Sequence, residues 1–220
     1  MDPRIPNAAR LQQQKNYPAA ERIYRQILRS QPKDPDALLL LGLLLHETGR
    51  QLECVETLKK AVVAGPNRPE VHQTLVSALV AMRRLPEAIE QAREVVRLRP
   101  MAGDAHHAVA RLLSQSKDFL ASLPFAHRST ELEPRSAAFL LTLSRVYLGL
   151  EDHTNAMAAL DRALSIDAKN ADVMIDKGQL LQGAGQMDKA LPLYQESLKL
   201  HEAKLGPDHP DTLTSMNNLA

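Results

Sequence analysis

The sequence lacks several residue patterns that would point to common classes of protein. It has no tryptophan, and only 3% of its 220 residues are aromatic, too few for the stacking platforms of single-strand nucleic-acid binders. Its one cysteine, Cys54, excludes an internal disulfide framework. With 27 basic and 26 acidic residues the net charge is +1, which gives no general attraction to nucleic acid or acidic membranes. We therefore expect no nucleic-acid partner.

Long apolar segments are missing too. The longest strongly apolar run, residues 37–45, is far shorter than the roughly 20 residues that a membrane-spanning helix needs. The first 14 residues contain no apolar core of a secretory signal. These absences predict a cytoplasmic protein without membrane insertion.

Motifs for catalysis and cofactor binding are also absent. The sequence contains no G-x-S-x-G, no P-loop, no G-x-G-x-x-G and no H-E-x-x-H. His106 and His107 are adjacent, so on a helix they point about 100° apart and share no face. We expect no catalytic residue, no metal site, no cofactor and no enzymatic activity.

Residues 32–66 have the pattern of a helical hairpin. Leu38, Leu41 and Leu45 recur at the spacing of one helix face. The segment 48–50 is a Gly-centred turn, and apolar residues resume at helical spacing after it. A single hairpin buries only one side of itself, so it needs a neighbouring hairpin on each flank.

The hairpin recurs along the chain. The closing prolines Pro32, Pro66, Pro100 and Pro134 are 34 residues apart, and the pattern resembles the tetratricopeptide repeat. The resemblance implies an all-α fold, a right-handed α-solenoid of antiparallel helix hairpins (a superhelix), as a single domain over residues 1–220. The expected repeats are 1–34, 35–68, 69–102, 103–136, 137–170 and 171–212, with a partial repeat at 213–220.

The C-terminal segment departs from this period. Residues 205–220 resemble the longer, 42-residue repeats of the kinesin light chain type, and Ala220 follows the matching Gly178 by 42 residues. Because the last repeat is unfinished, either the chain is a fragment or the last half-hairpin is a cap. Leu213, Met216 and Leu219 would then form an exposed edge through which the protein could self-associate.

In this family the first helices of the hairpins line a concave groove that binds peptide segments or partner helices. The resemblance implies that two residues on each first helix face this groove. They are Leu39, Leu43, Gln73, Ser77, His107, Arg111, Leu141, Arg145, Ile175 and Gln179.

Two features of these residues suggest what the groove binds. Leu39 and Leu43 make their helix apolar on nearly all sides, which indicates burial or a partner. Arg111 and Arg145 are 34 residues apart and suit a carboxylate. The hypothesis is a peptide with an apolar anchor and an acidic segment. The alternative is that the leucines pack on the first hairpin and that the arginines pair with acidic neighbours such as Asp104 or Asp176.

The resemblance therefore predicts a non-catalytic scaffold for protein–protein interaction. The lysine and asparagine clamp of chaperone-binding members is missing, since Leu39, Leu43, Gln73 and Ser77 occupy its places. The alternative function is the N-terminal arm of a larger enzyme, of the glycosyltransferase or sulfotransferase type, that recruits substrate proteins.

Overall fold

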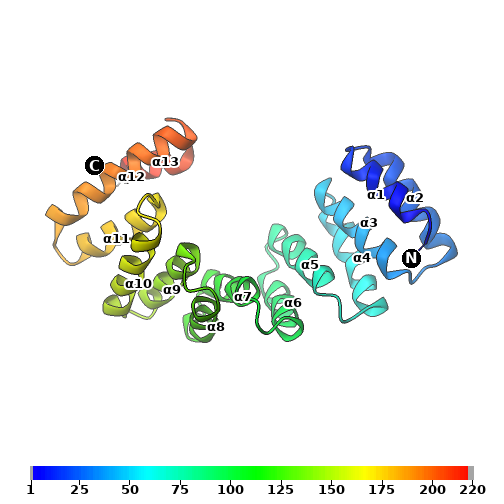
Figure 1. Ribbon diagram of the computed structural model, residues 1–220, viewed down its shortest axis with the longest axis horizontal. Coiled ribbons are helices and arrows are strands. Elements are labelled where there is room, and N and C mark those ends of the chain that lie inside the picture. Colours follow the sequence, from blue (N-terminus) through cyan, green and yellow to red (C-terminus); the bar gives the residue numbers. More distant parts are fainter. Residues whose placement is uncertain (1, 218–220) are drawn as a thin grey trace. The chain divides into compact units, whose positions relative to one another are not determined.

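The computed structural model describes residues 2–217, which form helices joined by short loops (Figure 1). Thirteen helices and no strand lie within these residues. The predicted all-α class of helix hairpins is confirmed. The helices are α1 (Ile5–Gln13), α2 (Tyr17–Ser30), α3 (Pro35–Glu47), α4 (Gln51–Ala64), α5 (Pro69–Ala81), α6 (Leu85–Leu98), α7 (Gly103–Gln115), α8 (Phe119–Leu132), α9 (Ala137–Gly149), α10 (His153–Ile166), α11 (Ala171–Gly183), α12 (Met187–Leu205) and α13 (Pro210–Asn217).

The chain divides into two compact units, Met1–Ala105 and His106–Ala220, whose boundary lies within α7. Within each unit, consecutive helices pack against each other, as α3 does on α4 and α9 on α10 (Figure 1). The proposed repeat boundaries stay a prediction. The last of them, 213–220, extends past the described part of the chain, because Leu219 and Ala220 lie outside it.

The turns inside the hairpins share one backbone feature. Residues with positive φ recur every 34 positions, at Lys15, Gly49, Arg83, Lys117, Glu151 and Gly185. A left-handed residue reverses the chain after a helix, and it costs a non-glycine residue roughly 1–2 kcal/mol. Only two of the six turns use glycine, which adopts this conformation freely. The conformation is therefore imposed by the geometry of the hairpin rather than by the residue type.

Side chains that pack between the two helices of a hairpin are matched in size. In several hairpins the first helix carries a small residue there and the second helix a larger one, whereas α5 and α6 carry Val76 and Ala92 at these places. Gly42 faces Leu58, and Gly178 faces Tyr194, both of which are fully buried. Ser144 and Leu160 occupy the corresponding places in α9 and α10, and both are also fully buried. Small residues let the helix axes approach closely, so in these hairpins the larger side chain of the second helix fills the space between the two helices.

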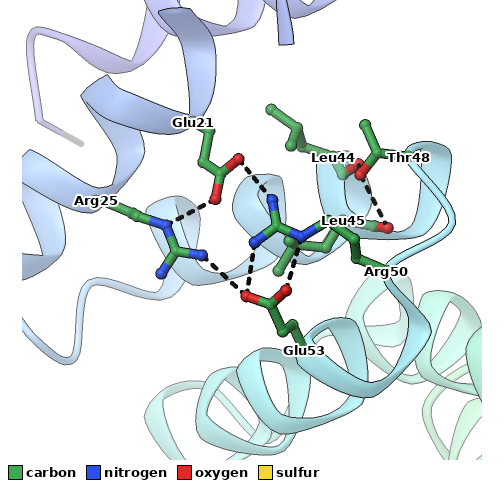
Figure 2. A network of polar contacts seen from close by, with 7 residues as sticks. All are labelled: Glu21, Arg25, Leu44, Leu45, Thr48, Arg50 and Glu53. Carbon is green, nitrogen blue, oxygen red and sulfur yellow. Dashed lines mark hydrogen bonds and ion pairs between the residues drawn. The ribbon is translucent and has the colours of Figure 1, made fainter. Parts of the chain in front are cut away.

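A charged network joins the first two hairpins of unit 1 (Figure 2). Arg50, at the start of α4, contacts both oxygens of Glu53 at 2.7 Å and reaches Glu21 of α2 at 2.7 Å. Arg25 completes the ring, 2.8 Å from Glu21 and 3.1 Å from Glu53. Figure 2 shows Glu21 between the two guanidinium groups. Hydrogen bonds from Arg50 lower the pKa of Glu53 below its usual 4.5.

We predict that Arg50→Gln destabilises the protein by about 1 kcal/mol or less, because the network is partly exposed and screened by salt. Because the pKa of folded Glu53 is lowered, the network stabilises the protein above pH 4.5, and this contribution is lost as the pH falls further. Urea unfolding at pH 7 and pH 3 should therefore show a smaller difference between wild type and variant at pH 3.

The matched control for this prediction is Arg22→Gln. Arg22 is exposed on α2 and forms no ion pair among residues 2–217. Its replacement should change stability equally little at both pH values, and a pH-independent effect of Arg50→Gln would contradict the network's role.

Candidate functional site

The residues predicted to line a groove divide between the two units, with four in unit 1 and six in unit 2. In unit 1, Leu39 and Leu43 on α3 are half-buried, as is Gln73 on α5, whereas Ser77 is exposed. The Ser77 hydroxyl donates to the Gln73 carbonyl oxygen at 3.2 Å. That bond stays within α5, so Ser77 can still accept a hydrogen bond from a partner.

The strongly apolar character of α3 has a structural explanation on most of its faces. Leu44 and Leu45 are fully buried, and Leu40 packs on the cluster of Ile5, Ile27 and Ala37. Burial against α1, α2, α4 and α5 therefore accounts for much of the apolar surface of this helix. Three leucines of α3 are only half-buried: Leu40, which packs on that cluster, and Leu39 and Leu43.

In unit 2, His107 on α7 is held by neighbours on α9. Its ring stacks on Phe139 with centroids 4.4 Å apart, and its Nε2 lies 2.8 Å from Thr142 Oγ1. Because the Thr142 hydroxyl donates to the Ala138 carbonyl oxygen, the Nε2–H of His107 is the donor in that contact. Burial, with a contribution from Arg111, lowers the pKa of His107 to about 4. His107 is therefore neutral at pH 7 and offers a ring rather than a charge.

The two predicted groove arginines differ in their pairing. Arg145 on α9 donates from Nε to Asp176 at 2.6 Å and from a terminal nitrogen to the same carboxylate at 3.2 Å. This pair raises the pKa of Arg145. Arg111 is exposed, and no ion pair joins it to a carboxylate within residues 2–217. Asp104, the other expected partner, pairs with Arg99 instead.

Three of the predicted residues meet at one pocket of unit 2. Arg145, Ile175 and Gln179 line a hollow of about 230 Å³. Leu141 has 8% of its surface exposed and packs in the core with Leu140 and Leu160, so it contributes little to this surface.

The remaining lining residues of this pocket were not predicted from the sequence as part of the site. They are Asp172 and Asp176 of α11, His201 of α12, and Asp211 and Thr214 of α13. Only Asp176 was foreseen, as an alternative partner for arginine. The sequence could have indicated that Asp176 lies at this site, because it follows Thr142 by one period and shares a helix face with Gln179.

Helix α13 is fixed to α12 beside this pocket. His201 is 6% exposed, and its Nδ1 lies 2.8 Å from Ser215 Oγ. The Ser215 hydroxyl donates to the Asp211 carbonyl oxygen, so His201 is the donor. The Thr212 hydroxyl also donates to the Gly206 carbonyl oxygen at 2.8 Å. These bonds position Asp211 and Thr214 at the pocket wall.

Cys54 is the one thiol that could act as a nucleophile, and its surroundings disfavour that role. It is fully buried in α4, and burial raises the pKa of its thiol to about 11. A thiol in such a site is protonated at neutral pH and unreactive. We predict that a thiol-reactive dye labels the native protein at pH 8 at least tenfold more slowly than the urea-unfolded protein, and equal labelling rates would contradict this packing.

None of the helices within residues 2–217 combines the length and the apolar character needed to cross a bilayer.

Comparison with known proteins identifies the repeat. Three protein-family sequence models, each described as tetratricopeptide repeat, match residues 8–69, 137–170 and 170–220, which together make up more than half of the chain. Protein O-mannosyl-transferase TMTC1 from Homo sapiens is 25% identical over 187 residues, and the match covers 83% of this chain but only 20% of that protein. The chain thus spans about a fifth of the length of that relative.

Solved structures show the same fold. PilW, described as a widely conserved type IV pilus biogenesis factor, superposes with a TM-score of 0.73 and 16% identity, covering 97% of this chain and 96% of PilW. YrrB, described as a TPR protein with an unusual peptide-binding site, gives a TM-score of 0.68 and 15% identity, covering 88% of this chain and 97% of YrrB. At these identities the likeness establishes the fold alone.

Proposed function

We propose that this chain, a tetratricopeptide repeat protein, is a non-catalytic scaffold that binds a peptide segment or partner helix along the surface of its first helices. The observation that carries the proposal is the pocket where Arg145, Ile175 and Gln179 converge. It is a hollow with charged, amide and hydroxyl groups on its wall, and such convergent polar groups are what fixes a bound chain in place. YrrB, a TPR protein with an unusual peptide-binding site, shares this fold and adds support by analogy.

The proposed contact residues are those expected from the repeat. In unit 1, Leu39 and Leu43 offer apolar surface, and Gln73 and Ser77 offer polar groups. In unit 2, His107 offers an uncharged ring, and Arg111, Arg145 and Gln179 offer hydrogen-bond donors, while Leu141 supports the surface from the core.

The acidic segment of the partner is assigned to Arg111. Arg145 already binds Asp176, whereas the guanidinium of Arg111 is exposed and forms no ion pair within the described residues.

A peptide selection tests this assignment. A displayed library of random peptides is selected on the wild-type protein, and the enriched peptides are measured by titration calorimetry. We expect acidic residues in the enriched peptides. We also expect at least tenfold weaker binding to Arg111→Glu, because reversing the charge adds repulsion to the lost attraction.

Arg135→Glu is the matched control. Arg135 is an exposed residue of the loop before α9 and forms no ion pair among residues 2–217. Peptides that bind Arg111→Glu as tightly as they bind Arg135→Glu would exclude Arg111 from the contact.

A second candidate function is a recruiting arm of a larger enzyme, such as a glycosyltransferase or sulfotransferase. One observation favours it: TMTC1, named as a mannosyl-transferase, matches most of this chain while extending well beyond it. Sequencing the full transcript past Ala220 tests this candidate. An added catalytic domain would support the arm, and added repeats would support the scaffold.

Three finer features belong to the proposal: a longer C-terminal repeat, self-association and a cytoplasmic location. The kinesin-light-chain-type repeat is supported by the length of α12, which has 19 residues where α10 has 14. Self-association through α13 is supported by Leu213, which is 47% exposed, and by half-buried Met216. We place the protein in the cytoplasm on the grounds of its sequence.

For self-association, we predict that wild type sediments as a larger species than Leu213→Ser at the same concentration. Identical sedimentation of the two proteins across a hundredfold concentration range would exclude this edge.

A further inference from the structure

A second and larger hollow of unit 2 lies beside α11 and is mostly apolar. It has a volume of about 830 Å³ and is bounded by the end of α9 and by α10, α11 and α12. Its apolar wall comprises Leu148, Met157, Leu180, Leu181 and Leu193. This volume lies in the range of sites that bind small molecules or large side chains. The hollow shares Asp176 and Gln179 with the groove pocket, but most of its wall is separate.

The repeat explains why this hollow exists. One period earlier, the Phe119 ring at the start of α8 packs against Gly149 at the end of α9, so closely that no side chain would fit on that glycine. The residues 34 positions later are His153, which is exposed, and Gly183, whose added Cβ would meet no atom within 4 Å. The place that Phe119 fills in one interface is therefore open in the next.

The wall of the hollow carries two carboxylates and two ammonium groups, and they differ in how they are paired. The carboxylate of Asp161 is bound by Lys177 at 2.6 Å, and that of Asp176 is bound by Arg145. Lys189 donates to the neutral amide oxygen of Gln186 at 3.0 Å and is otherwise exposed. Both carboxylates are thus paired with a cation, while the Lys189 ammonium has only a neutral partner within residues 2–217. The rim complements an anion rather than a cation.

We infer that this hollow binds an aromatic side chain of a partner protein, next to a carboxylate that pairs with Lys189. The ring takes the place that Phe119 occupies in the preceding interface, and the apolar wall removes it from water. The inference goes beyond the proposed function, because the hollow can take a ring whether or not the first-helix surface binds a peptide.

The smallest probe with both features is 3-phenylpropionate, which carries one phenyl ring and one carboxylate. The readout is the methyl resonance of Met157 in methyl-labelled protein, assigned with Met157→Leu, because a ring bound beside a methyl group shifts its resonance. The expected result is a saturable shift of this resonance with 3-phenylpropionate, and at least threefold weaker binding of the cationic analogue 3-phenylpropylamine. No saturable shift up to the solubility limit, or equal binding of the two analogues, would overturn the inference.

A filling variant provides the second test. His153→Phe restores the residue found one repeat earlier, and Gly183→Leu fills the hollow from the other side if the first variant misfolds. Each should weaken 3-phenylpropionate binding at least tenfold, whereas His153→Ala, which leaves the hollow open, should bind as wild type does.

His153→Phe should also raise the urea midpoint of unfolding above that of His153→Ala, because its ring is buried. Unchanged binding by the folded filling variants, or an equal midpoint for His153→Phe and His153→Ala, would contradict the proposed occupant.

Discussion

Gly178→Ser is expected to destabilise the protein by about 2–3 kcal/mol, at the upper end of the cost of overpacking a core. A Cβ on Gly178 would lie 2.5 Å from Cε1 and 2.9 Å from Cζ of Tyr194. Tyr194 is fully buried, and its hydroxyl donates to Gln182 at 2.8 Å. The ring therefore cannot move aside without breaking this bond or shifting the helix. Urea unfolding of wild type and variant measures the decrease in the free energy of unfolding.

A double variant tests the mechanism of this loss. Gly178→Ser with Tyr194→Leu recreates the Ser144 and Leu160 pair, which is fully buried one period earlier in the chain. The two substitutions should therefore cost less together than the sum of their separate effects, with a coupling of about 1 kcal/mol or more. Additive effects would show that the contact with Tyr194 is not the cause.

Gly183→Ser is the matched control for the first prediction. Gly183 ends the same helix, is exposed, and has no atom within 4 Å of an added Cβ. The same substitution there should change stability by less than about 0.5 kcal/mol. A loss as large as that of Gly178→Ser would mean that helix α11 tolerates no serine, whatever its packing.

Leu160→Ala is expected to cost about 2–5 kcal/mol, the range measured when a buried leucine is truncated. Leu160 is fully buried on α10, in a cluster with Leu140, Leu141 and Val173. These neighbours come from α9 and α11, so the side chain joins two consecutive hairpins. Removing it leaves a cavity that rigid helices on both sides cannot collapse.

Leu120→Ala is the matched control for this prediction. Leu120 lies on α8 and is 76% exposed. The same truncation there should change the free energy of unfolding by less than about 0.5 kcal/mol. Equal effects of the two truncations would contradict the placement of Leu160 in the core.

The hairpins could be predicted from the sequence because their signals are local and repeated. The helical spacing of Leu38, Leu41 and Leu45 required nothing from outside their own segment. All three are buried. The 34-residue period likewise places the small residues Gly42 and Gly178, whose closeness to Leu58 and Tyr194 the structure then specifies.

The sites could be predicted only in part, because they depend on contacts between hairpins. The period placed Arg145 and Gln179 on one surface, but it did not decide whether Arg145 would pair with Asp176 or stay available. Neither did it reveal the hollow beside Gly183, which exists because His153 stands where the preceding interface has Phe119. Such features follow from differences between repeats, whereas repeat analysis emphasises what the repeats share.

Mapping the bound peptide by backbone amide shifts tests the scaffold account most directly. A peptide selected on the wild-type protein is titrated into isotopically labelled protein, and the shifted amides are assigned to helices. The account predicts that the largest shifts in unit 2 fall on the first helices, around His107, Arg111, Ile175 and Gln179. Shifts confined to the second helices α8 and α10, or absent throughout, would contradict it.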